Sequence, residues 1–273
     1  MLKRLADGRV RARPGEMFYR HAGPEGAPSM VHLHGFGISG TYLLPTAALL
    51  ANDYNTYVPD LPGYGRSPGP RKPLSINALA DSVVAFMDSV GLERTTIVAN
   101  SMGCMVTGRC IERHPDRIER AVLVSPAGSL HNRPLGRGLS QLMRDGLHEP
   151  NRLLSVAGPD YARFGLINSV RLFVEMSKSP TVKNLFAMRT PVLVVVGHSD
   201  PLMPAFDDLL SLSEAADQRP HLGVVYLRDA AHAINFSHPA ELAQVIGAYL
   251  TDPTLSDPAA LPVDADVLAH AEY

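Results

Sequence analysis

The sequence has two cysteines, no tryptophan and a formal net charge of only −2. Cys104 and Cys110 lie six residues apart in a segment with a helical pattern, where positions i and i+6 face different directions. This spacing argues against an intrahelical disulfide and predicts that Cys104 is a small buried residue. Such sparse use of cysteine is typical of a reducing compartment, so we expect a cytoplasmic protein.

The absent features also exclude several classes of partner. No apolar run approaches the roughly 18–20 residues of a membrane span, so no membrane partner is expected. The small net charge gives no general attraction to nucleic acid. Residues 1–9 carry charge with no apolar stretch behind them and are not expected to act as a secretory signal peptide. A small-molecule substrate is the expected partner, and the oligomeric state stays open, with a homodimer as one option.

Short β-type runs alternate with longer helical patterns along the chain. This order predicts an α/β fold with a mostly parallel central sheet and helices on both faces. We expect strands at residues 29–33, 55–58, 95–99, 120–124, 191–196 and 223–227, and helices at 44–50, 75–90, 102–114 and 239–250. Residues 9–20 alternate loosely and predict an antiparallel hairpin at the sheet edge.

The alternation stops between residues 127 and 189. This stretch has short helical pieces, no clear strand, and nine basic against four acidic residues. We therefore expect a basic helical insertion at 127–189 that divides a core made of residues 1–126 and 190–250. Residues 251–273 are rich in Pro, Asp and Ala and predict a loosely attached C-terminal extension.

The strongest chemical signal is Asn100-Ser101-Met102-Gly103, which directly follows the expected strand at 95–99. A strand, a serine and a helix in immediate succession are typical of a nucleophile elbow. The turn is tight, so the residues two before and two after the serine must be small. Gly103 obeys this requirement, and Ala99 departs from it by one methyl group. The alternative interpretation is that Ser101 only caps the following helix.

A nucleophilic serine needs a base and a residue that orients the base. Asp200 follows the apolar run at 192–196 and can orient a histidine, although aspartates also occur there in plain turns. The other usual position for this acid is the end of the preceding strand. There the chain has Ser125 and no carboxylate, so this alternative to Asp200 is removed. His232 follows the last strand and is the expected base. His238 is a poorer candidate because it precedes Pro239 at the start of a helix.

Together these residues resemble the α/β-hydrolase superfamily. The matching stretches are HGFG at 34–37, DLPGYGRS at 60–67, NSMG at 100–103, HPDRIERAVLVSPAG at 114–128, GHSDPLMP at 197–204 and AAHAINFSHP at 230–239. The resemblance implies an α/β-hydrolase fold, a Ser101–His232–Asp200 triad and no cofactor. It also implies that residues 127–189 form a helical cap, inserted after the strand expected at 120–124, over the active site.

The HGFG stretch resembles the loop that supplies the second oxyanion N–H in this superfamily. The implied donors are the backbone N–H groups of Phe36 and Met102. Gly35 and Gly37 let the backbone approach the developing oxyanion, and with Asn100 they are expected to contact substrate.

A metal site is the competing idea for the upstream histidines. His32 and His34 alternate on one strand without obvious further ligands, so no metal is expected. The basic residues of the expected cap are interpreted first as solvated. The sharper hypothesis is that Arg171 binds a substrate carboxylate.

Within the superfamily the chain looks similar to the meta-cleavage-product C–C hydrolases and to small esterases and lactonases. Residues 100–103 and 125–128 resemble the C–C hydrolases, whereas Ala233 stands where those enzymes usually carry a tryptophan, and residues 36–40 lack their second glycine-rich stretch. We expect a serine hydrolase that cleaves a small, largely apolar ester or lactone through an acyl-enzyme. The alternatives are a C–C hydrolase of vinylogous diketo acids, a lyase or synthase of the same fold, and a non-catalytic binding protein.

Overall fold

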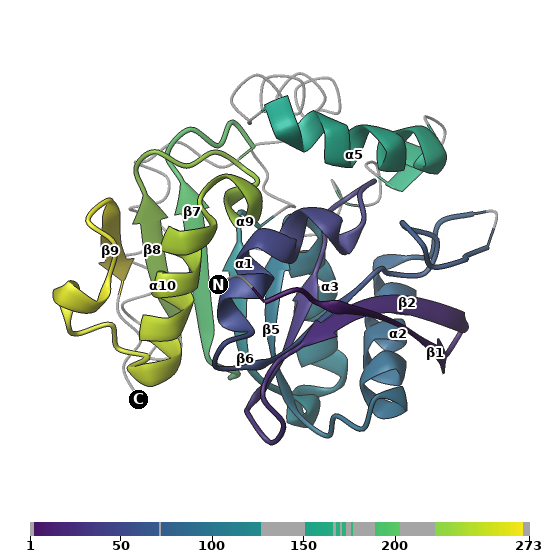
Figure 1. Cartoon of the computed structure of the whole chain (residues 1–273), viewed down its shortest axis with the longest axis horizontal. Coiled ribbons are helices and arrows are strands. Elements are labelled where there is room, and N and C mark those ends of the chain that lie inside the picture. The colour runs from purple at the N-terminus through teal and green to yellow at the C-terminus, as the bar shows by residue number, and fades with distance from the viewer. Residues whose placement is uncertain are drawn as a thin grey trace.

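The described part of the chain contains one sheet of nine strands (Figure 1). The computed structural model describes residues 3–70, 72–126, 151–165, 168–169, 171–172, 176, 189–202 and 222–269. The strands are β1 (Ala6–Ala12), β2 (Gly15–Ala22), β3 (Ser29–Leu33), β4 (Asn55–Pro59), β5 (Thr95–Asn100), β6 (Ile118–Val124), β7 (Val192–Gly197), β8 (Leu222–Leu227) and β9 (Ala265–Ala269). Their order in the sheet is β1-β2-β4-β3-β5-β6-β7-β8-β9.

The middle of the sheet is parallel, from β4 through β3, β5, β6 and β7 to β8. The antiparallel pairs lie at the edges, where β1 and β2 form the expected hairpin. At the other edge β9 pairs antiparallel with β8. Leu255 and Leu261 are buried in the core beside it. The prediction of a loosely attached extension is therefore wrong for the described residues up to 269, because apolar side chains and a strand ladder hold the segment to the core.

Helices cover both faces of the sheet, as the sequence predicts. The helices are α1 (Leu44–Leu50), α2 (Ile76–Ser89), α3 (Met102–Arg113), α5 (Asn151–Phe164), α9 (Ile234–Ser237) and α10 (Pro239–Thr251). Alternate residues of β6 contribute to two hydrophobic clusters, one on each face of the sheet. Ala121 and Leu123 pack in the cluster with α2 and α3, whereas Val122 and Val124 pack in the cluster with α9 and α10. Central strands buried on both faces explain the continuous apolar runs in the sequence.

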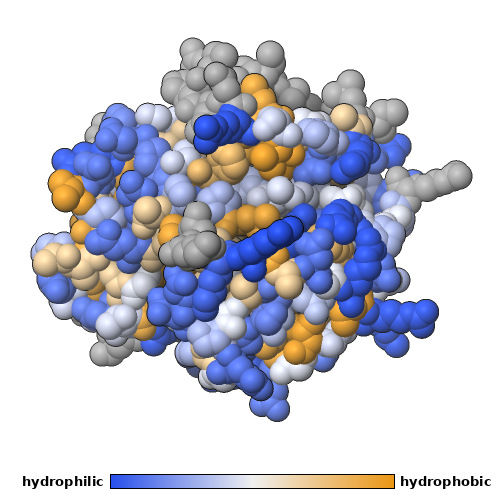
Figure 2. Space-filling view, viewed as in Figure 1, coloured by the Kyte–Doolittle hydropathy of each residue, from blue (hydrophilic) through white to orange (hydrophobic). Residues whose placement is uncertain are grey.

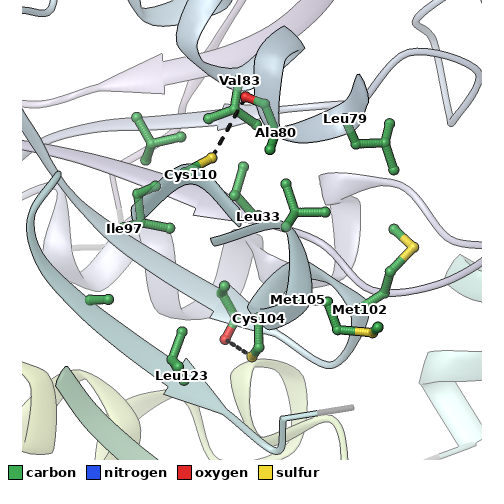
Figure 3. Packing of buried hydrophobic residues seen from close by; sticks show 14 of the residues in the cluster. Leu33, Leu79, Ala80, Val83, Ile97, Met102, Cys104, Met105, Cys110 and Leu123 are labelled. Atoms are coloured by element: carbon green, nitrogen blue, oxygen red, sulfur yellow. Dashed lines mark hydrogen bonds between the residues drawn. The ribbon is translucent and has the colours of Figure 1, made fainter. Parts of the chain in front are cut away.

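Both cysteines lie on α3 within the first of these clusters (Figure 3). The Cys104 thiol donates to the carbonyl oxygen of Ala99 at 3.3 Å, and the Cys110 thiol donates to that of Ala80 at 3.6 Å. Burial raises the pKa of both thiols, that of Cys110 to about 12. The prediction that Cys104 is a small buried residue outside any disulfide is confirmed.

Asp60 anchors three segments at the end of the sheet that carries the expected active site. Its fully buried carboxylate accepts hydrogen bonds from Arg20 Nη1 at 3.0 Å, from the Gly40 N–H at 2.9 Å and from the Arg66 N–H at 2.9 Å. The Arg20 guanidinium also lies 4.7 Å from the centre of the Phe18 ring. A buried carboxylate is stable when paired and hydrogen-bonded in this way, so strand β2 and the loops after β3 and β4 are held together.

Helix α5 lies in the segment expected to form the cap, and it crosses one end of the core (Figure 1). Residues 127–150 and most of 166–188 lie outside the described residues. Figure 2 shows hydrophilic and hydrophobic residues interspersed over the visible face. Among the described residues, the exposed large apolar side chains are Leu154, Tyr161 and Val263. None of the described helices has the length and apolar character that a membrane span requires.

Candidate active site

Ser101 lies between the end of β5 and the first residue of α3, in a backbone conformation that is unusual for serine. Its φ is 55° and its ψ is −118°. A non-glycine residue in this region is strained by about 1–3 kcal/mol, and such residues cluster at functional sites. The Ser101 side chain makes no capping hydrogen bond to the helix, and its backbone lies outside the extended region typical of an N-cap. The helix-cap alternative is therefore wrong.

Small residues allow the turn at Ser101 to approach β3 closely. A Cβ atom on Gly103 would lie 2.5 Å from the backbone oxygen of Leu33 and 3.0 Å from that of His34. Leu33 and Ala99 are register partners in the parallel β3–β5 pair. The start of α3 is therefore packed directly against the backbone that enters the expected oxyanion loop, and Gly103 is required for that contact.

Replacing Gly103 with alanine is expected to destabilise the protein by about 1–3 kcal/mol and to lower its hydrolytic activity, because the added methyl group meets backbone atoms that cannot rotate away. Thermal unfolding and ester turnover would measure the two effects. Gly247→Ala is the matched control, since this helical glycine has nothing within 4 Å of its Cβ position and should be neutral or stabilised by up to about 1 kcal/mol. Equal melting temperatures for the two variants would contradict the packing argument.

His232 and Asp200 form a buried hydrogen-bonded pair. The distance from His232 Nδ1 to Asp200 Oδ2 is 2.8 Å, and the Asp200 side chain is 0% exposed. The other carboxylate oxygen, Oδ1, accepts the Leu202 N–H at 2.9 Å. Because β7 and β8 are parallel neighbours, their following loops emerge at the same edge of the sheet. Gly197 lets these loops touch, since a Cβ there would lie 2.4 Å from the Ala230 oxygen.

Asn100 joins the histidine loop to the turn that carries Ser101. Its Nδ2 donates to the backbone oxygen of His232 at 3.0 Å and to that of Val124 at 3.2 Å. Its Oδ1 accepts a hydrogen bond from the Tyr42 hydroxyl at 2.7 Å. Asn100 is 2% exposed, and both its amide nitrogen and its amide oxygen form hydrogen bonds within the protein. These internal partners argue against the expected substrate contact of Asn100 and show that its side chain holds backbone segments together.

The loop after β3 lies against Ser101. A Cβ on Gly35 would be 3.2 Å from the Ser101 Cβ, so only glycine fits at this approach without displacing a neighbour. The Gly35 N–H donates to the Tyr42 hydroxyl at 2.8 Å and is not directed to a ligand. Gly37 has a φ of 71°, and a Cβ there would lie 2.6 Å from the Tyr161 ring. Gly37 therefore packs closely against α5, while Gly35 lies beside the serine, and the expected substrate contacts of both glycines stay predictions.

The two histidines at the end of β3 differ in their surroundings. His34 Nδ1 lies 2.9 Å from the Gly35 oxygen, and Nε2 accepts the Leu61 N–H at 2.9 Å. Both ring nitrogens of His32 are buried without a hydrogen-bond partner among the described residues, and burial lowers its pKa to about 3. Within the described part of the chain, no group of three His, Cys, Asp or Glu side chains is placed to hold a metal ion.

Phe36 and Met102, the implied oxyanion donors, are the residues that follow Gly35 and Ser101, which lie in close contact. Met102 is the first residue of α3, where a backbone N–H has no partner within the helix. The Phe36 ring packs against α5, with its centre 5.8 Å from that of Phe164 and 6.4 Å from that of Tyr161. The two residues therefore lie on the two segments that meet at Ser101, and their role as donors stays a prediction.

Helix α5 is attached to the same loop by a buried carboxylate. Asp160 Oδ2 accepts the Ser39 N–H at 2.8 Å, and Asp160 is 8% exposed. Phe164 stacks on Tyr64 with the ring centres 4.9 Å apart. Sequence reasoning missed Asp160, because nothing in the pattern of 127–189 shows which of its charges is buried. Arg171 is exposed, which favours its interpretation as a solvated residue.

The chain resembles known proteins in sequence. The model of the Alpha/beta hydrolase family matches residues 30–245. The chain is 22% identical over 249 residues to "Uncharacterized carboxylesterase nap" of Bacillus subtilis (strain 168), covering 84% of this chain and 81% of that protein. It is 25% identical over 247 residues to the pimeloyl-(acyl-carrier protein) methyl ester esterase of Aeromonas hydrophila subsp. hydrophila, covering 80% and 94%.

The fold is also similar to solved structures. A membrane phospholipase A, described as a bacterial virulence factor, matches with a TM-score of 0.75 and 22% sequence identity, covering 90% of this chain and 86% of that chain. At this identity the similarity concerns the fold.

Proposed function

Because the chain belongs to the alpha/beta hydrolase family, we propose that it is a serine esterase that cleaves a small, largely apolar carboxylic ester or lactone. Ser101 is the nucleophile, His232 the general base and Asp200 the residue that orients the base. The observation that carries this proposal is the strained Ser101 backbone at the strand–helix turn, tied through Asn100 to the loop of a buried His232–Asp200 pair.

The reaction has two halves. In the first, His232 takes the Ser101 hydroxyl proton while the serine oxygen attacks the carbonyl carbon of the substrate. The tetrahedral oxyanion is held by the N–H groups of Phe36 and Met102. Its collapse breaks the bond to the leaving oxygen, which receives the proton from His232, and leaves an acyl-enzyme on Ser101.

In the second half, His232 takes a proton from water, and the water oxygen attacks the acyl carbon. Collapse then releases the carboxylic acid and returns the proton to Ser101. Asp200 accepts the Nδ1–H of His232 throughout, so that the other ring nitrogen, Nε2, is the one that exchanges protons. No step changes an oxidation state.

The surroundings of the serine support an apolar substrate. Phe36 and Phe164 bring aromatic surface to the loop beside Ser101. An ester is favoured because similar proteins carry the names carboxylesterase and methyl ester esterase. The exposed position of Arg171 supports its interpretation as a solvated residue more than the hypothesis that it binds a substrate carboxylate.

A labelling and turnover experiment tests this proposal. A fluorophosphonate probe is expected to modify Ser101, identified by peptide mapping, and short p-nitrophenyl esters are expected to be hydrolysed. Lactones and vinylogous 1,5-diketo acids complete the substrate panel. Cleavage of diketo acids without any ester turnover would favour the C–C hydrolase instead. A protein that neither reacts with the probe nor turns over any member of the panel would favour a binding protein.

A further inference from the structure

Tyr42 lies at the junction of the three segments that carry the proposed active site. It belongs to the short 3₁₀ helix Gly40–Leu43 and is 2% exposed. Its hydroxyl accepts the Gly35 N–H at 2.8 Å and donates to Asn100 Oδ1 at 2.7 Å. A phenol can do both at once because it has one donor and free lone pairs.

The connection continues from Asn100 to the base. Asn100 Nδ2 donates to the backbone oxygen of His232 at 3.0 Å. A chain of hydrogen bonds therefore runs from Gly35 through Tyr42 and Asn100 to His232. These residues follow or end β3, β5 and β8, so the chain joins the oxyanion loop, the nucleophile turn and the histidine loop.

The position of Gly35 determines where one proposed oxyanion donor points. The C=O of Gly35 and the N–H of Phe36 belong to one planar peptide and point in opposite directions. His34 Nδ1 lies within hydrogen-bonding distance of that C=O, at 2.9 Å, while Tyr42 holds the N–H on the other side of the Gly35 Cα. The direction of the Phe36 N–H therefore depends on both contacts.

We propose that Tyr42 is a positioning residue for the hydrolytic reaction. Through Gly35 and Asn100, its hydroxyl sets the oxyanion donor of Phe36 at the correct distance from Ser101 and His232. This inference rests on the proposed function, because it assumes that Ser101 attacks a carbonyl and that Phe36 supplies an N–H to the resulting oxyanion. Tyr42 itself touches no reacting atom in this proposal.

The Tyr42→Phe variant tests the proposal, since it removes the hydroxyl and keeps the ring. The Gly35 N–H and Asn100 Oδ1 then lose this partner. We expect kcat for a p-nitrophenyl ester to fall roughly 10–100-fold with KM changed less than about threefold, because the oxyanion contact operates in the transition state. Affinity for a trifluoromethyl ketone, which forms a tetrahedral oxyanion on the serine, should fall in parallel with kcat/KM.

Tyr249→Phe is the matched control. Tyr249 is fully buried in α10, and its neighbour Leu250 accepts a hydrogen bond through its backbone oxygen from Arg120, near the start of β6. Ser101 instead lies beside Val124 at the opposite end of that strand. Tyr249→Phe thus removes a buried phenol hydroxyl away from the site, and it should leave kcat and ketone affinity unchanged.

A double-mutant cycle with Asn100→Ala tests whether Tyr42 acts through Asn100. If it does, the double variant should lose little more activity than Asn100→Ala alone. Additive losses would overturn this route. An unchanged kcat and ketone affinity in folded Tyr42→Phe would overturn the inference as a whole. Failure of the wild-type protein to hydrolyse any ester would instead overturn the proposed function, so the two failures are distinguishable.

Discussion

Replacing Ser101 with alanine is expected to lower kcat on any ester that the protein hydrolyses by roughly 10⁶-fold. The variant has no oxygen to attack the carbonyl carbon, and only the oxyanion contacts and substrate binding remain to lower the barrier. Steady-state turnover of a p-nitrophenyl ester measures the loss, and labelling by the fluorophosphonate probe should disappear with it. Ser82→Ala is the control, because Ser82 is a buried serine on α2 whose hydroxyl bonds to Leu79 in its own helix.

The strained backbone at Ser101 predicts a difference in stability between two variants at this position, which is measured by their melting temperatures. Alanine at a φ of 55° keeps the strain that serine carries, whereas glycine adopts this region readily. Ser101→Gly should therefore be as inactive as Ser101→Ala but should melt at a higher temperature. Near-normal turnover by either variant would show that Ser101 is not the nucleophile.

Replacing Asp200 with asparagine is expected to lower kcat by roughly 10³–10⁴-fold while the protein stays folded. Asp200 Oδ2 accepts a hydrogen bond from His232 Nδ1, and an asparagine amide at this place can donate instead and stabilise the wrong tautomer. The bond from the Leu202 N–H to Oδ1 can survive, since asparagine keeps an acceptor oxygen. Steady-state kinetics across a range of pH would measure the loss.

Asp229→Asn is the matched control for Asp200→Asn. Asp229 is exposed in the turn after β8, three residues before His232, so the variant removes the same charge near the same histidine. Its kcat should stay within about twofold of the wild-type value because an exposed charge is screened by solvent. If the two variants lost equal activity, net charge near the loop and not orientation of His232 would explain the effect.

The secondary structure of the core could be predicted because its signals are local. The run at 192–196 is apolar at every position because β7 is buried on both faces. Ser75 precedes α2 and caps it by accepting the Ala78 N–H, which helps to place the start of that helix. The strand β9 was missed because the side chains of Ala265–Ala269 lack a strong apolar pattern, and its pairing with β8 is a contact distant in sequence.

The order of Ser101, Asp200 and His232 along the chain led to the prediction of all three residues of the proposed triad, since each follows an apolar strand and parallel strands end at one edge. The bond between His232 and Asp200, the strained turn at Ser101 and the inward amide of Asn100 are decided only by the tertiary structure. Tyr42 belongs to none of the sequence motifs, so the sequence did not single it out. A hydroxyl gains a role at such a site only when folding brings its partners within hydrogen-bonding distance, and residue type and spacing do not encode that distance.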